Sequence, residues 1–242
     1  MKNYWLNRIF YLLSRNQLVN TIKSHKNSKF KENPEKILPI VTIESITDNS
    51  EPVLAEKEHV NGNVSFQELQ YISKIVKHYQ PKTIFEIGTF DGRTTLNMSL
   101  NAPGAEIFTL DLPKKEIFKT RYRVKTGDLT FIDKQQSGIR FIGTESEKRI
   151  TQIYADSAQF DYSKYENSID LIFIDGSHTY DYVISDTKIA MKLLRNKKGV
   201  IIWHDYGWYE VIKAINEFYQ EGGVFADIKN VEGTSLAFLH IG

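Results

Sequence analysis

One short segment, TIFEIGTFDGRTT over residues 83–95, restricts the fold of this chain most strongly. Its β-branched and aromatic start runs to Gly88 and predicts a buried strand that enters a tight turn. Residues 93–100 contain no Gly or Pro and predict a helix. A helix that begins after a glycine turn presents unpaired N–H groups to a polar ligand. The segment therefore predicts a strand–turn–helix binding site of the nucleotide type.

The same turn lacks the patterns that bind phosphates. It has no Gly-Lys-Ser/Thr ending, which a P-loop requires, and Phe90 occupies the position of the second glycine of a dinucleotide fingerprint. That glycine lets a pyrophosphate approach the backbone. We therefore expect a ligand without a pyrophosphate. A nicotinamide-dependent oxidoreductase is an alternative on the same fold, and Phe90 argues against it.

Strand-like and helix-like segments alternate along the rest of the chain. Strands are predicted at 83–87, 105–110, 151–154, 169–174, 199–203, 224–228 and 235–240, and helices at 92–100, 179–195 and 207–221. Another helix begins at Ser65, which has capping-box spacing to Glu68, and ends before Pro81. Nearly continuous apolar strands are typical of a parallel sheet covered on both faces. The pattern predicts an α/β fold with a doubly wound, mostly parallel seven-stranded sheet and helices on both faces, of the Rossmann-like kind.

Residues 1–63 differ from the rest and predict an N-terminal helical extension with a linker. Residues 1–31 contain seven Lys or Arg and no acidic residue, and apolar residues recur at helical spacing between Trp5 and Leu13. Such a basic amphipathic helix can lie on an anionic membrane. The alternative is packing on the domain or on a second copy of the chain in a homo-oligomer. Residues 24–62 are polar and predict a linker with one short strand at 37–43, so we place the domain at 64–242.

Composition excludes several classes of protein. The 242 residues include no cysteine, which rules out disulfides, thiolate zinc sites and cysteine nucleophiles. The absence of cysteine suits a reducing compartment. No stretch of the sequence approaches the roughly 20 apolar residues that are needed to span a bilayer. We expect a cytoplasmic protein, held peripherally at a membrane if residues 1–31 bind lipid.

Five successive predicted strands each deliver an acidic residue to the same edge of the sheet. These residues are Glu86, Asp111, Asp156, Asp175 and Asp205, with His204 beside the last. A single Asp is common in turns and helix caps, and capping by Asp175 or a plain turn at 204–205 is the alternative. Five in register beside a glycine turn favour a binding site.

The spacing of one acid indicates the ligand. Asp111 follows Gly88 by 23 residues, close to the roughly 20 expected for an acid that accepts hydrogen bonds from ribose hydroxyls. A ribose without a pyrophosphate, in a pocket whose acids favour a cation, predicts S-adenosylmethionine as the cofactor.

Several motifs, in this order, resemble those of class I S-adenosylmethionine-dependent methyltransferases. They are FEIGTFDGRTT, TLD, YADS, IDLIFIDGSHTYDYVISD and GVIIWHDY. The chain is most similar to the branch with Asp-Gly-x-His-x-Tyr and His-Asp-Tyr motifs, which is related to catechol-type, macrocin-type and cephalosporin-pathway O-methyltransferases. The resemblance covers about residues 64–242. It implies methyl transfer to a hydroxyl of a small molecule, a sugar or a secondary metabolite. An N-methyltransferase and a membrane-associated binding module are the alternatives.

The resemblance also implies roles for individual residues. Around the cofactor it places Glu86, Gly88, Thr89, Phe90, Gly92, Asp111, Leu112, Asp156, Ser157 and Asp175. The implied ligands of a divalent metal are Asp175, His204 and Asp205, and the implied catalytic residues are His178, Asp175 and Asp205. His178 is the candidate general base, with a pKa expected near neutral pH, or else a structural histidine that orients the loop. Histidine at position 204 departs from the usual carboxylate or carboxamide and suits Mn²⁺ or Fe²⁺ as well as Mg²⁺.

Residues 112–150 separate two predicted strands by more than a usual connection. Residues 114–125 contain six Lys or Arg and one Glu. Such a charged run is usually a solvated surface. Because the insert is expected above the active-site edge of the sheet, the run is also consistent with a lid over an anionic acceptor, such as a phosphorylated or carboxylated sugar. We expect no nucleic acid partner, because the basic run contains only two aromatic residues, Phe118 and Tyr122.

Overall fold

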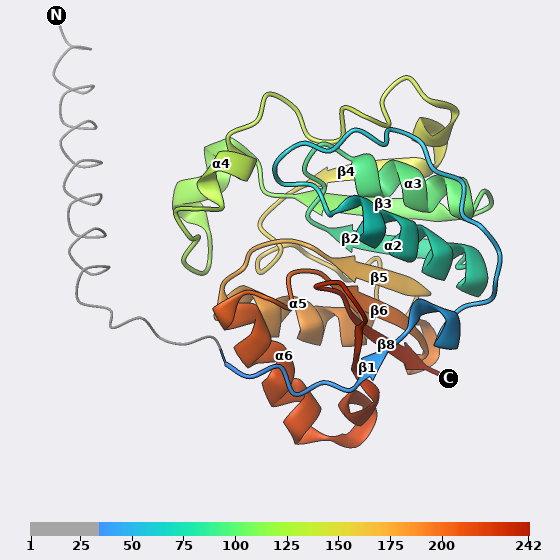
Figure 1. Cartoon of the computed structure of the whole chain (residues 1–242). Helices are drawn as coiled ribbons and strands as arrows, with labels where there is room; N and C mark the ends of the chain where they lie inside the picture. Colours follow the sequence, from blue (N-terminus) through green and yellow to red (C-terminus); the bar gives the residue numbers. More distant parts are fainter. Residues whose placement is uncertain (1–33) are drawn as a thin grey trace, which may run out of the picture. The chain divides into compact units, whose positions relative to one another are not determined.

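An eight-stranded sheet forms the centre of the computed structural model, which describes residues 34–242 (Figure 1). The strands are β1 (Ile40–Val41), β2 (Thr83–Ile87), β3 (Glu106–Asp111), β4 (Ile150–Tyr154), β5 (Leu171–Ile174), β6 (Gly199–Trp203), β7 (Lys229–Val231) and β8 (Ala237–Ile241). Their order is β1-β7-β8-β6-β5-β2-β3-β4, and only β8 is antiparallel to its neighbours. The predicted fold class is confirmed, with one strand more than the seven expected.

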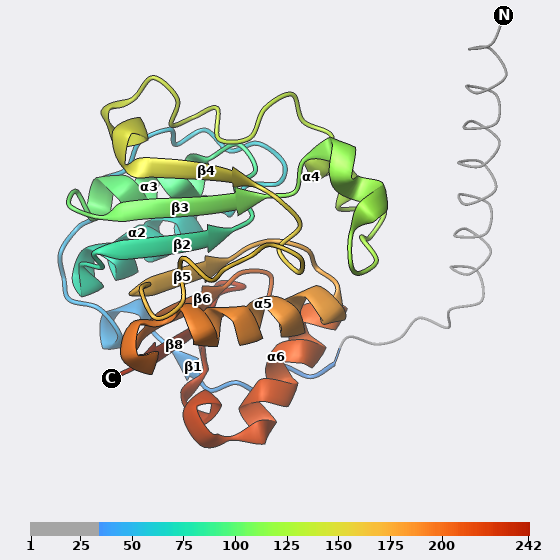
Figure 2. The same ribbon diagram turned by 180° about the vertical axis from the view of Figure 1, so that it is seen from behind.

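Helices cover both faces of the sheet (Figures 1 and 2). One face carries α2 (Phe66–Tyr79) and α3 (Arg93–Asn101), and the other carries α5 (Tyr180–Leu193) and α6 (Tyr209–Glu221). Side chains of a strand point alternately to the two faces. In β5, Ile172 and Ile174 belong to one buried cluster, whereas Leu171 and Phe173 belong to the other. The sheet is therefore buried on both sides, as its continuous apolar strands predict.

The predicted elements differ from the observed ones at the expected strand 224–228. That prediction is wrong, because Gly223–Asp227 form a short 3-10 helix and the strand begins at Lys229. Gly222 and Gly223 have φ angles of 78° and 60°, which turn the chain away from the sheet. The ring of Phe225 then packs on Phe218 of α6, with 4.7 Å between ring centroids. An apolar pair was thus mistaken for a strand.

Residues 34–63 belong to the same compact unit as the domain, which extends over Pro34–Gly242, so no unit boundary lies at 63–64. β1 pairs with β7, and the Tyr206 hydroxyl accepts a hydrogen bond of 3.1 Å from the backbone N–H of Ile37. The side chains of Asn97 and Asn101 hold the backbone of residues 53–55. The predicted basic helix and its charge lie outside the described residues.

The insert between β3 and β4 lies beside the carboxyl ends of the parallel strands. It contains a 3-10 helix at Lys114–Lys119, α4 at Leu129–Ile132 and a 3-10 helix at Glu145–Arg149. Figure 2 shows α4 close to the end of β3. Within residues 34–242, no helix is long and apolar enough to cross a membrane.

Candidate active site

A cavity of about 270 Å³ opens at the carboxyl edge of the sheet. Its apolar lining includes Ile87, Phe90, Leu110, Leu112, Phe131, Ile132 and Trp208, and its charged lining includes Asp111, Lys134, Asp128, Asp175, His178, His204 and Asp205. The strands β2, β3, β5 and β6 end here, because parallel strands bring their carboxyl ends to one edge. The cavity therefore combines an apolar body with a few convergent polar groups, which is typical of a small-molecule site.

Most of the residues predicted around the cofactor line this cavity. They are Gly88, Phe90, Asp111, Leu112, Asp156, Ser157 and Asp175, whereas Glu86, Thr89 and Gly92 do not line it. Glu86 is fully buried beneath the glycine turn and accepts hydrogen bonds from the hydroxyls of Thr95 and Thr109. Burial raises the pKa of Glu86 to about 8. Glu86 therefore supports the turn from below and does not line the cavity in which the cofactor was expected.

Two glycines of the turn, Gly88 and Gly92, lie so close to neighbouring atoms that a side chain would not fit. Gly88 has a φ of 99°, and a Cβ atom there would overlap the backbone carbonyl of Asp175 at the end of β5. Gly92 has a φ of 84°, and its Cβ would lie 2.7 Å from the Cα of Gly138 and from the Phe141 ring. Gly92 therefore lets the insert pack against the start of α3, which explains this glycine without a cofactor contact.

The predicted ribose acid, Asp111, is held by the insert. Its Oδ2 atom accepts a hydrogen bond from Ser137 and lies 2.7 Å from the Nζ atom of Lys134. Neither Lys134 nor Ser137 was predicted, because both lie beyond the basic run and match no motif. Within residues 34–242, only Oδ2 has these partners, which leaves Oδ1 for a ligand.

Asp156 lines the cavity, and its carboxylate has several hydrogen-bond partners within the protein. Its Oδ1 atom accepts hydrogen bonds from Ala158 N at 3.0 Å and Tyr182 OH at 2.9 Å. Its Oδ2 atom accepts from Arg121 N at 2.7 Å and Gln159 Nε2 at 2.6 Å. A carboxylate offers about four acceptor positions, and all are used here. Asp156 therefore connects the insert to α5.

His178 lies between two carboxylates. Its Nδ1 atom lies 2.7 Å from Asp128 Oδ1, and its Nε2 atom lies 2.6 Å from Asp205 Oδ2. Burial opposes the protonated ring, but the hydrogen bonds and charges of the two acids outweigh it and raise the pKa of His178 to about 10. The pKa near neutral pH expected from the sequence is therefore not what this environment produces. Asp128 was not predicted, since the insert carries it far from any motif.

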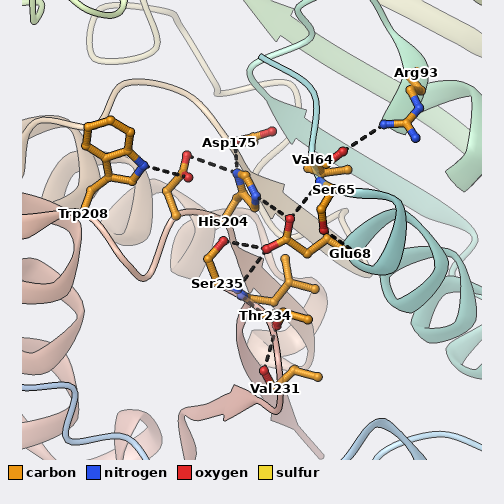
Figure 3. A network of polar contacts seen from close by, with 12 residues as sticks. Val64, Ser65, Glu68, Arg93, Asp175, His204, Trp208, Val231, Thr234 and Ser235 are labelled. Carbon is orange, nitrogen blue, oxygen red and sulfur yellow. Dashed lines mark hydrogen bonds and ion pairs between the residues drawn. The ribbon is translucent and has the colours of Figure 1, made fainter. Parts of the chain in front are cut away.

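His204 lies within contact distance of the other two predicted metal ligands, Asp175 and Asp205, and Figure 3 shows His204 beside Asp175. Its Nδ1 atom lies 2.8 Å from Asp175 Oδ1 and 3.1 Å from Asp205 Oδ2, and one ligand atom from each residue lies within 4.8 Å of the others. Adjacent ligands in an octahedral shell with bonds of about 2.1 Å lie about 3.0 Å apart. The spacing and the mixed nitrogen and oxygen donors therefore fit a divalent cation. Burial disfavours a charged ring, but Asp175 and the neighbouring acids raise the pKa of His204 well above its usual value.

Glu68 is a fourth acid beside this group, and the sequence indicated only its place in a capping box. The capping box is confirmed, since Ser65 and Glu68 bond reciprocally at the start of α2. Oε2 of Glu68 also lies 3.3 Å from His204 Nε2 (Figure 3). Burial disfavours the charged carboxylate, but the hydrogen bonds and charge of His204 and the donors of Ser235 hold the pKa of Glu68 well below its usual value.

The outer wall of the site combines an aromatic residue with the basic insert. Trp208, which is 55% exposed, donates from Nε1 to Asp205 Oδ1 at 3.0 Å, and its ring centroid lies 5.3 Å from that of His178. Lys125 donates to the backbone carbonyl of His178 at 2.6 Å. Lys125 and Arg123 also face the carboxylate of Glu210 at 3.3 and 3.6 Å. These contacts hold the first half of the insert against the N-terminal ends of α5 and α6.

Comparisons with known proteins agree with this arrangement. A family model described as a methyltransferase domain matches residues 85–206, half of the chain. The uncharacterized protein R132 of Acanthamoeba polyphaga mimivirus is 36% identical over 80 residues, which cover 31% of this chain and 33% of that protein. The match thus spans about a third of that relative.

Solved structures with the same fold include several methyltransferases. The SAH-bound methyltransferase PaMTH1 of Podospora anserina has a TM-score of 0.54 at 16% identity, over 75% of this chain and 81% of that one. The O-methyltransferase TomG of Streptomyces achromogenes, in complex with SAM, has a TM-score of 0.52 at 14% identity, over 74% and 82% of the two chains. An O-methyltransferase from Bacillus cereus in complex with SAH has a TM-score of 0.50 at 19% identity, over 76% and 84%. At these identities the likeness shows the fold.

Proposed function

Because the chain belongs to the methyltransferase domain family, we propose that it transfers a methyl group from S-adenosylmethionine to a hydroxyl group of a small molecule. One observation carries the proposal. A single cavity has the ribose acid Asp111 in its lining together with an acid–histidine cluster, which consists of Asp175, His178, His204 and Asp205. The cofactor, when bound, supplies an electrophilic methyl group on a sulfonium.

The lining of the cavity suits this cofactor. Oδ1 of Asp111 is free to accept hydrogen bonds from ribose hydroxyls, because Lys134 and Ser137 occupy only Oδ2. Gly88, where a Cβ atom would overlap the carbonyl of Asp175, lets the turn after β2 lie directly against the end of β5. Asp175 lies at the same edge, and a carboxylate there favours a cationic ligand over a diphosphate. The similar folds of SAM- and SAH-bound methyltransferases support the same cofactor.

The acid–histidine cluster favours a hydroxyl over an amine as the acceptor. An alcohol must lose its proton as the new oxygen–carbon bond forms, so the site needs a proton acceptor. His178 Nε2 and Asp205 Oδ2 lie 2.6 Å apart, which is the distance of a hydrogen bond through one proton. When this pair has lost that proton, it can take the proton of the acceptor hydroxyl. Asp128 holds Nδ1 at 2.7 Å, so the imidazole stays aimed at the cavity.

A divalent cation fits the same cluster. Asp175, His204 and Asp205 would hold it, and the ion, when bound, would favour the alkoxide form of the acceptor hydroxyl. One imidazole and two carboxylates suit Mn²⁺ and Fe²⁺ as well as Mg²⁺. We propose that the enzyme uses such a cation. We also propose that its acceptor is an acidic sugar or secondary metabolite. Lys125 and Arg123 of the insert face a single carboxylate, that of Glu210 in α6, and this excess of positive charge supports the acidic acceptor.

The test uses matched acceptors and labelled cofactor. Methyl transfer from S-adenosylmethionine is measured by mass spectrometry for pairs of small molecules that differ only in a hydroxyl or an amine, each with and without a carboxylate. We expect methylated hydroxyls, with faster transfer to the carboxylated member. Transfer only to amines would support an N-methyltransferase. Binding of NADH without binding of S-adenosylmethionine would overturn the proposal.

A further inference from the structure

We propose that Glu68 is a positioning residue of the active site, which holds the Nε2–H of His204 so that the Nδ1 atom faces Asp175 and Asp205. Figure 3 shows His204 between Glu68 and Asp175. The inference rests on the proposed metal site, and it assigns a function to a residue in a helix that contributes no predicted ligand.

Glu68 is fixed by its own contacts. The residue is 7% exposed, and Oε1 accepts hydrogen bonds from the backbone N–H and the hydroxyl of Ser235 at 2.9 and 2.7 Å. Oε2 accepts from the backbone N–H of Ser65 at 2.9 Å and faces His204 Nε2 at 3.3 Å. The four donors occupy the acceptor positions of the carboxylate. Glu68 therefore stays behind the histidine and does not enter the group of metal ligands.

This contact determines which nitrogen of His204 is free for a metal. Neutral imidazole carries one N–H and one lone pair, and the hydrogen bond of one nitrogen sets the role of the other. A carboxylate at Nε2 favours a proton there and a lone pair at Nδ1. Nδ1 is also the nitrogen at 2.8 and 3.1 Å from the two aspartates. Histidine ligands of metals usually donate their second N–H to a carboxylate in this way.

Helix capping alone does not account for Glu68. A capping box needs one side-chain oxygen, which Gln supplies as well as Glu. Oε1 lies outside the cap, and its only hydrogen-bond partner within residues 34–242 is Ser235. The carbonyl of Ser235 accepts a hydrogen bond from the backbone N–H of Tyr206 at 2.8 Å. Tyr206 follows the ligands His204 and Asp205 directly in the chain. Glu68 thus joins α2, the end of β6 and the turn before β8 around one imidazole.

The test compares Mn²⁺ affinity, followed by electron paramagnetic resonance, in the full chain and two variants. Glu68→Gln keeps the size of the side chain but removes the charge, and we expect Mn²⁺ binding about 10- to 100-fold weaker. The matched control is Ser65→Ala, which removes the other half of the capping box and leaves the carboxylate in place. We expect this control to lower stability and leave Mn²⁺ affinity unchanged. Equal affinity of the wild-type protein and Glu68→Gln, or an equal loss in both variants, would overturn the role of Glu68.

A second measurement needs no folded variant. Nitrogen NMR of the Mg²⁺-loaded wild-type protein, labelled with ¹⁵N-histidine, should show the His204 ring protonated at Nε2. Protonation at Nδ1 would overturn the inference. A wild-type protein that binds neither Mn²⁺ nor Mg²⁺ would instead overturn the proposed metal site, and this inference with it. The two failures are therefore distinct.

Discussion

Replacing Asp186 with Asn should stabilise the protein at alkaline pH and have a smaller effect in acid. Asp186 lies in α5, is 1% exposed, and has an Oδ1 atom without a hydrogen-bond partner among the described residues. Burial raises the pKa of Asp186 to about 7. A hydrogen bond from Ser157 lowers this pKa by a smaller amount, and the charge of Asp156 raises it slightly further. The hydroxyl of Tyr162 is the other ionisable group that interacts with it.

The expected magnitude follows from this pKa. A rise from 3.8 to about 7 is about 3 units, and each unit corresponds to about 1.4 kcal/mol between the two protonation states. The folded protein retains the proton to a higher pH than the unfolded chain does. The free energy of unfolding therefore falls between pH ~4 and pH ~7, by about 4 kcal/mol in all, and the contribution is constant above that range.

Urea unfolding of both proteins at pH 5 and pH 8 measures the effect. Between these pH values the stability of Asp186→Asn relative to wild type should increase by about 3 kcal/mol. Any packing or hydrogen-bond cost of the amide is the same at both pH values and cancels in this comparison. Asp181→Asn, on the exposed side of the same helix, is the control and should show no such change. A stability difference that is equal at pH 5 and pH 8 would refute the reasoning.

Three further predictions concern the cofactor, the cation and the N-terminal segment. Asp111→Ala should weaken S-adenosylmethionine binding by about 1.5–3 kcal/mol in calorimetry, because hydrogen bonds to a charged group are lost, and unchanged affinity would contradict its ribose role. EDTA should abolish methyl transfer until Mn²⁺, Fe²⁺ or Mg²⁺ is returned, and Asp205→Ala should reduce turnover strongly with little change in cofactor affinity; full activity in EDTA would exclude the metal. Deletion of residues 1–31 should abolish binding to anionic liposomes, and salt should weaken binding of the full chain. Aggregation of the shortened chain would instead support packing of this segment on the domain.

The fold was largely predictable because strands buried on both faces have a strong signal. β2 and β6 match their predicted ranges, and the capping box marks the start of α2 correctly. β1 has only two residues, and it lies within the short strand predicted at 37–43. Val224 and Phe225 are as apolar in a short helix as in a strand, so that segment could not be distinguished by composition.

The site was predictable only where topology alone places a residue. Asp175 and Asp205 end adjacent parallel strands, so their proximity follows from the strand order. Asp128 and Lys134 reach the cavity because of the path of an irregular insert, which no sequence periodicity describes. Glu68 contacts His204 from a helix on another part of the chain, and its capping role concealed this contact.

The contacts of Glu68 also bear on the order in which the protein becomes functional during synthesis. Ser235 follows Glu68 by 167 positions, and His204 follows it by 136. Contacts of such separation form late, because a long loop must close before they contribute any stability. A nascent chain that ends before residue 235 already contains the family-matched segment 85–206, yet it lacks the serine that fixes the glutamate behind His204. Glu68 should therefore become fixed behind His204 only with the last part of the chain to be synthesised, when β8 also enters the sheet between β6 and β7, so that the metal site and the sheet are completed together.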